Sequence, residues 1–79
     1  MNKREQRSNP NRYLAPAGVT IRIENRRRPF VVDKPFYVLK VGKGRFLAKG
    51  PKTLYCDGSL VTINSSFYIS VSQRNLVKR

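Results

Sequence analysis

The sequence predicts a small all-β protein, built as an antiparallel meander of five to six short strands that curls into a bent sheet or a small barrel. Three observations favour this class: apolar and polar residues alternate with a period of two, turn signals recur at short intervals, and no segment carries a helical apolar stripe. A chain of 79 residues has room for one domain with a thin core. We expect a basic arm over residues 1–18, a β domain over 19–72 and a basic tail over 73–79.

The first 18 residues carry several basic side chains and very few apolar ones. Such a segment buries too little apolar area to offset the entropy lost on ordering, so we expect a disordered arm. Tyr13 and Leu14 are the exceptions, and they are candidates for anchoring the arm to a neighbour.

A strand is predicted to begin at Val19, because Val19, Ile21 and Ile23 alternate with polar residues and would share one face. Residues 25–29 end this strand, since they contain three adjacent arginines and a proline that cannot donate to a ladder. A short extended run follows over 30–33.

Glycines predict the next hairpin. Strands over 36–41 and 45–49 flank Gly42-Lys43-Gly44, where two glycines allow the positive dihedral angles of a three-residue loop with a bulge. A chain turn of this kind makes the two strands antiparallel neighbours.

Asp57-Gly58 is the strongest turn signal in the chain. Both residue types tolerate the left-handed region, as a type I′ turn requires, and the turn would join strands over 53–56 and 59–63. A last strand is expected over 67–71. The turn predicts two cross-strand pairs, Tyr55 with Leu60 and Leu54 with Val61.

Two parts of the predicted sheet are apolar on both faces: the strand over 36–41 and the hairpin around Asp57. Both faces must therefore be covered. The sheet could fold over itself, as in barrels of the SH3 or OB kind, or another subunit could cover it.

Charge gives the main functional indication. The chain has 17 lysines and arginines against 4 acids, for a formal net charge of +13. Solubility needs only about 2 to 8 charges in a small domain, so this excess indicates a polyanionic or acidic partner.

The residues that catalysis and metal binding require are scarce. There is no histidine, Cys56 is the single cysteine, and the acids Glu5, Glu24, Asp33 and Asp57 are scattered along the sequence. General acid-base catalysis and soft-metal sites use clusters of these groups. We expect a protein that is not an enzyme and has no cofactor, no metal site and no disulfide.

The basic residues and three tyrosines are the candidate binding residues. The arginines of the loop after the first strand can fork onto phosphate oxygens, and the lysines of the following hairpin should form a ridge. The tyrosines could stack on unpaired bases, or they could simply cover the core with their rings. The expected phosphate contacts are Lys3, Arg4, Arg7, Arg12, Arg26, Arg27, Arg28, Lys40, Lys43, Arg45, Lys49 and Lys52. The candidate stacking residues are Tyr37, Tyr55 and Tyr68.

These features predict a protein that binds the phosphate backbone of nucleic acid, DNA or RNA, with little sequence preference. One alternative is a small structural subunit of a virion or ribonucleoprotein, whose arm contacts the genome or a neighbour and which forms a homo-oligomer or a larger assembly. Another is an inhibitor that docks on an acidic protein surface. No apolar stretch marks a secretory signal or a membrane span, so we expect a protein that is not secreted and is cytoplasmic or associated with a nucleoprotein or virion, and we rank membrane binding last.

Overall fold

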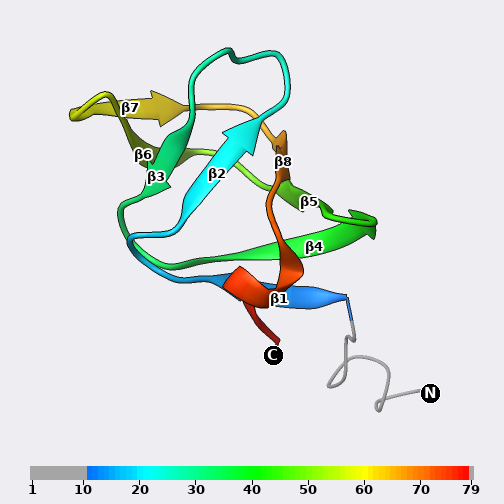
Figure 1. Cartoon of the computed structure of the whole chain (residues 1–79). Coiled ribbons are helices and arrows are strands. Elements are labelled where there is room, and N and C mark those ends of the chain that lie inside the picture. The colour runs from blue at the N-terminus through cyan, green and yellow to red at the C-terminus, as the bar shows by residue number, and fades with distance from the viewer. Residues whose placement is uncertain (1–10, 79) are drawn as a thin grey trace.

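The computed structural model describes residues 11–78, so residues 1–10 of the expected arm, with Lys3, Arg4 and Arg7, lie outside the described residues. Within 11–78 the chain forms nine strands and one short 3₁₀ helix (Figure 1). The elements are β1 (Arg12–Ala15), β2 (Thr20–Ile23), β3 (Phe30–Val32), β4 (Phe36–Gly42), β5 (Arg45–Ala48), β6 (Lys52–Cys56), β7 (Ser59–Ile63), β8 (Phe67–Ser70), η1 (Gln73–Asn75) and β9 (Val77–Lys78).

All nine strands belong to one antiparallel sheet in the order β7-β6-β3-β2-β8-β5-β4-β1-β9. The all-β antiparallel class is thus confirmed, but the sheet is not closed into a barrel, because β7 and β9 remain as edges. The expected meander of five to six strands is wrong. Only β2-β3, β4-β5 and β6-β7 are hairpins, whereas β2-β8, β5-β8 and β3-β6 join segments far apart in the sequence.

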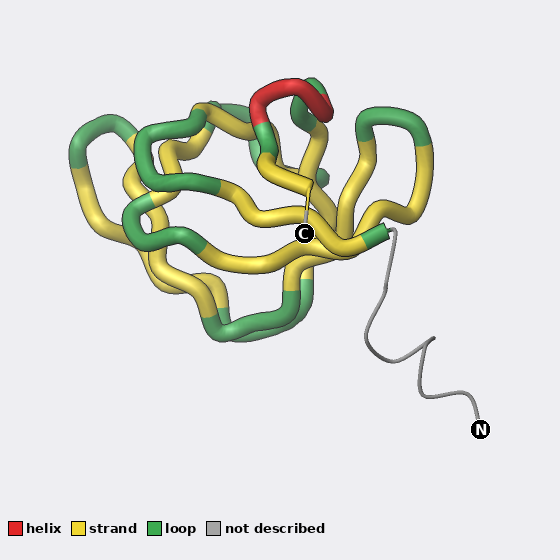
Figure 2. The backbone as a smooth tube through the Cα atoms, turned by 90° about the horizontal axis from the view of Figure 1, so that it is seen from below, coloured by secondary structure: helices red, strands yellow, loops and turns green. Residues whose placement is uncertain are grey.

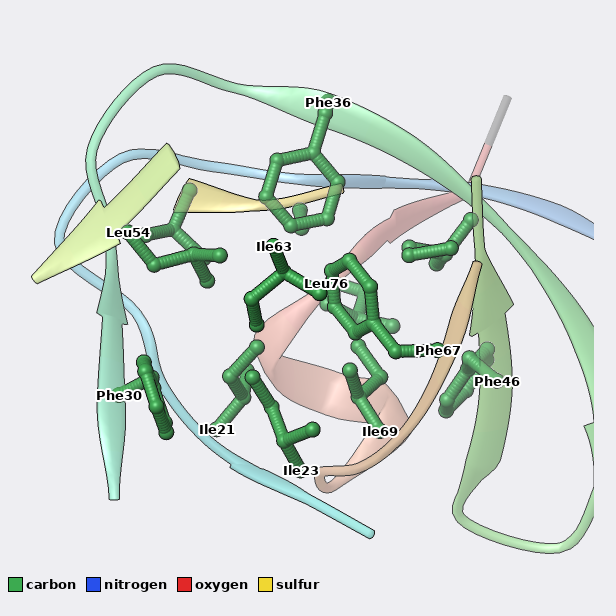
Figure 3. Packing of buried hydrophobic residues seen from close by; sticks show 14 of the residues in the cluster. Ile21, Ile23, Phe30, Phe36, Phe46, Leu54, Ile63, Phe67, Ile69 and Leu76 are labelled. Carbon is green, nitrogen blue, oxygen red and sulfur yellow. The ribbon is translucent and has the colours of Figure 1, made fainter. Parts of the chain in front are cut away.

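The sheet bends so that its two halves enclose one hydrophobic core. Side chains from both halves point into this common interior (Figure 3), among them Ile21 of β2, Phe46 of β5, Leu54 of β6 and Ile69 of β8. Each of these four is almost inaccessible to solvent. Since β2 pairs with β3 on one side and β8 on the other, it is the strand that connects the halves. Because the sheet folds over on itself, its inner face is covered.

β1 corrects the expected boundary of the arm at residue 18. Tyr13 and Ala15 are buried at 4% and 0% exposure, and Tyr13 packs edge-on against Phe46 with ring centroids 5.4 Å apart. Leu14 points the other way, opposite Tyr37 of β4 and Val77 of β9. Residues Arg12–Ala15 thus form a strand of the sheet, and Tyr13 is anchored in the protein's own core.

The expected C-terminal tail also takes part in the fold. Residues 73–75 form η1, Leu76 enters the core, and β9 pairs with β1. In Figure 2 the turn of η1 lies directly before the strand that carries the C-terminus.

The Asp57-Gly58 hairpin is confirmed in detail. Asp57 and Gly58 have φ of 54° and 82°, as a type I′ turn requires, and Tyr55 pairs with Leu60 and Leu54 with Val61. The glycine hairpin differs from expectation, because Gly42 pairs with Arg45 and leaves a two-residue loop in which Gly44 has the positive φ. The expected bulge is present as a register shift between Lys40 and Gly42.

Candidate nucleic-acid interface

The outer face of the sheet, which points away from the core, carries an apolar strip across β1, β4, β5 and β8. Directly opposite residues share a face, so the register places side chains of four strands in one outward row. The leucines of the strip are half-buried, whereas its tyrosines are exposed. The row is Arg12, Leu39, Leu47 and Tyr68, and the neighbouring row contains Leu14 and Tyr37. We name Leu14, Tyr37, Leu39, Leu47 and Tyr68 together the outer platform.

Each tyrosine of the outer platform has a guanidinium over its ring. The guanidinium carbon of Arg12 lies 3.9 Å from the ring centroid of Tyr37, and that of Arg45 lies 4.1 Å from the centroid of Tyr68. Both distances are well inside the range of a cation-π interaction.

The two guanidinium groups differ in how they are held. Arg45 donates from Nε to Glu24 Oε2 at 2.9 Å and from Nη2 to Glu24 Oε1 at 3.3 Å, a bidentate pair. The hydrogen bond to Glu24 raises the pKa of Arg45 above its ordinary value. Arg12, by contrast, has no carboxylate partner within residues 11–78. Arg45 is therefore fixed and largely neutralised, whereas Arg12 keeps its charge available.

A hollow of about 310 Å³ opens on the outer platform. It is lined by the apolar residues Val38, Leu39 and Leu47, by Tyr37, and by the cations Arg12 and Lys49, which are both exposed. An apolar lining with two exposed cations can take a flat apolar group that carries a negative charge beside it.

The loop between β2 and β3 holds the three consecutive arginines, and all three are exposed. Arg28 Nη1 lies 3.1 Å from Asp57 Oδ2, while Arg22 Nη2 donates to the backbone oxygen of Arg27 at 3.2 Å. Within residues 11–78, Arg26 and Arg27 have no carboxylate partner. Arg26 also lines an open hollow of about 400 Å³ together with Ser65, Ser66 and Tyr68.

The expected ridge of basic residues along the β4-β5 hairpin does not form as one surface. Lys43 sits in the β4-β5 loop, and Lys49 follows the far end of β5, about 13 Å from Arg45 by strand geometry. Lys40 Nζ donates to Gln73 Oε1 at 2.8 Å. Lys52 lies 5.8 Å from the ring centroid of Phe36, in another hollow.

The three candidate stacking tyrosines fall into two groups. Tyr37 and Tyr68 belong to the outer platform, but Tyr55 lies on β6, opposite Val31 and Leu60, in the other half of the sheet. The strand order puts β3 and β2 between β6 and β8. Tyr55 therefore does not share a binding surface with the other two.

Sequence reasoning missed the leucines that line the hollow and the pairing of Arg12 with Tyr37. Both depend on β1 lying beside β4, which the low apolar content of residues 1–18 concealed. The available signal was weak: Tyr13, Leu14 and Ala15 form a short apolar run in an otherwise polar segment.

The described part of the chain offers little for other chemistry. It holds no group of three potential metal ligands, and Cys56 is a free thiol that packs against the core. Among residues 11–78 no helix is long and apolar enough to span a bilayer.

Comparison with protein-family models, curated proteins and solved structures finds no match for this chain.

Proposed function

We propose that this protein is a non-enzymatic nucleic-acid-binding protein that grips the phosphate backbone with little sequence preference. The observation that carries the proposal is that most basic side chains of the described residues have no acidic partner. Within residues 11–78 only two ion pairs form, Arg28 with Asp57 and Arg45 with Glu24. The other basic side chains of residues 11–78 have no carboxylate partner, and the whole chain carries a formal net charge of +13 that a polyanion could neutralise.

The Arg26–Arg28 loop supports a backbone-binding mode. Its side chains are exposed and project from a connection between strands, where planar guanidinium groups can each contact two phosphate oxygens. A recognition helix is one common means of reading bases in the major groove, and the only helical segment of the described residues is a 3₁₀ turn of three residues. The proposal therefore assigns the phosphates, rather than the base edges, to the loop.

A second candidate is a structural subunit of a nucleoprotein or virion. It is favoured by exposed apolar side chains on both edge strands, Leu60 of β7 at 54% and Val77 of β9 at 44%. An assembly could cover these edges by strand pairing. The native mass of the protein separates the two candidate functions, because a structural subunit is expected to form an oligomer.

The proposed function is tested by titrating salt against binding to single-stranded and duplex DNA and RNA. We expect affinity to fall steeply as salt rises. Replacing Arg26, Arg27 and Arg28 by serine should weaken binding to every probe and flatten the salt dependence, while circular dichroism stays unchanged.

A matched control removes the same charge elsewhere, by replacing Lys34, Arg74 and Lys78 with serine. A larger loss of affinity in the variant of the Arg26–Arg28 loop than in the control supports the proposal. Equal losses would show that net charge alone matters, and an absence of binding by the unaltered protein at low salt would eliminate the function.

A further inference from the structure

We propose that the outer platform binds unpaired bases of a single strand, with one base in the hollow beside Tyr37 and a second base at Tyr68. This inference rests on the proposed function and goes further, because it names the ligand as single-stranded nucleic acid and the site as one face of one half of the sheet.

The hollow fits one nucleotide by its chemistry. The ring of Tyr37 and the leucines Leu39 and Leu47 offer an apolar surface for a base, while the exposed cations Arg12 and Lys49 can reach the phosphates on either side. Arg12 covers the Tyr37 ring and has no carboxylate partner within residues 11–78, so it can turn from the ring to a phosphate as the base enters.

Tyr68 forms a different kind of stacking site. Glu24 holds the guanidinium of Arg45 in place over the ring, so ring and guanidinium form one fixed cation-π pair. Bases stack on guanidinium planes as well as on aromatic rings. A base can therefore be received here without moving Arg45.

The spacing of the two tyrosines selects a single strand. Tyr68 lies opposite Leu47, Leu47 opposite Leu39, and Tyr37 is two residues from Leu39. Strand spacing and residue rise then put the two tyrosines roughly 12 Å apart. Neighbouring stacked bases in a duplex strand are about 3.4 Å apart. Two neighbouring bases can therefore reach both tyrosines only if they are splayed, and each base needs a free face to stack on a side chain, which a single strand offers and a duplex does not.

Tyr55 provides a matched control within the same chain. Its exposure of 40% lies between those of Tyr37 and Tyr68, at 42% and 37%. Within residues 11–78 no cation lies over its ring, and its neighbours across the strands are Val31 and Leu60. Loss of this ring removes the same aromatic area from the opposite half of the sheet.

The experiment measures affinity of the full chain for a ten-residue oligothymidylate, for an abasic strand with the same number of phosphates, and for a duplex of the same length. We expect Tyr37→Leu and Tyr68→Leu each to weaken binding of the oligothymidylate about 5- to 100-fold, which corresponds to the loss of one stacked base. Tyr55→Leu should bind like the unaltered protein. Tyr37→Phe and Tyr68→Phe, which keep the ring, should retain the affinity.

The abasic strand reports phosphate binding alone. The unaltered protein should bind it more weakly than the oligothymidylate, and the leucine variants should bind it with unchanged affinity. Equal effects of the three leucine variants, or equal affinity for the two strands, would overturn the stacking site. Strong salt-dependent binding of all probes would then leave the proposed function intact, whereas no binding to any probe would remove both.

Discussion

Arg45 lies over the ring of Tyr68, with its guanidinium carbon 4.1 Å from the ring centroid, and it is held there by Glu24 on the neighbouring part of the sheet. The contact joins β5 to β8, which are neighbours in the sheet although Arg45 and Tyr68 are 23 positions apart in the sequence. Arg45 therefore has a defined place on the outer platform, unlike Arg26 and Arg27 of the β2-β3 loop, which have no carboxylate partner within residues 11–78, and it contributes shape more than free charge.

Glu24→Gln should release the charge of Arg45. Because a released guanidinium can neutralise one more phosphate, the plot of log affinity against log salt should become steeper by about 0.7 to 0.9. Asp33→Asn is the matched control, since it adds the same charge at a carboxylate that has no ion-pair partner within residues 11–78. Equal slopes for the two variants would show that Glu24 does not withhold Arg45 from the ligand.

Truncation should show where the fold begins. A chain that starts at Asn11 keeps β1 and the hydrogen bond from Lys40 N to Asn11 O, so it should unfold at the temperature of the full chain. A chain that starts at Val19 loses Tyr13 and Ala15 from the core. Removing one large buried side chain costs about 3 to 5 kcal/mol, which approaches the whole stability of a small domain.

Thermal melts followed by circular dichroism compare the two truncations. A cooperative transition at an unchanged temperature in the shorter chain would contradict the structural role of β1.

Gly50 is required by close packing. A Cβ atom there would lie 2.5 Å from the backbone oxygen of Ser65 and 2.6 Å from that of Asn64. Gly50→Ala should therefore lower the free energy of unfolding by about 1 to 3 kcal/mol, or more if the backbone cannot shift. Gly42→Ala is the control, because its Cβ would meet nothing closer than 3.7 Å. Urea unfolding of both variants gives the comparison, and equal stabilities would refute the packing argument.

Asp57 has two separable roles, in the turn and in the pair with Arg28. Asn tolerates the positive φ of 54°, so Asp57→Asn should keep the turn and lose only an exposed ion pair, which is worth about 0 to 1 kcal/mol. Asp57→Val should cost about 1 to 2 kcal/mol more, because a branched side chain is strained in this conformation. Chemical unfolding distinguishes the two, and similar stabilities would mean that the turn is not limiting.

The hairpins could be predicted from local chemistry, but the order of the strands in the sheet could not. The Asp57-Gly58 turn and its register follow from the backbone preferences of two residues, and the alternation of Ile21 and Ile23 follows from burial on one face. The pairing of β2 with β8 and of β1 with β4 joins segments that no turn connects. Such pairings are decided by how the whole sheet encloses its core, which no local pattern reports.

The candidate site likewise has a part that could be predicted from the sequence and a part that could not. The exposed Arg26–Arg28 loop could be identified from its sequence, because three arginines before a proline cannot enter a packed strand. The grouping of Tyr37 with Tyr68 and the exclusion of Tyr55 required the strand order. The hollow beside Tyr37 also required β1, since Arg12 reaches that ring only from the neighbouring strand.

The pairing of Tyr13 with Lys78 brings the two ends of the described chain side by side on adjacent strands. A short linker between these ends, with a new opening at the Asp57-Gly58 turn, would give a circular permutant with every strand intact. In Figure 1 the end of the described chain, after β9, lies at the lower side and the β2-β3 loop projects at the top. A protein immobilised by its C-terminus would therefore present its arginine loop outward, toward solution.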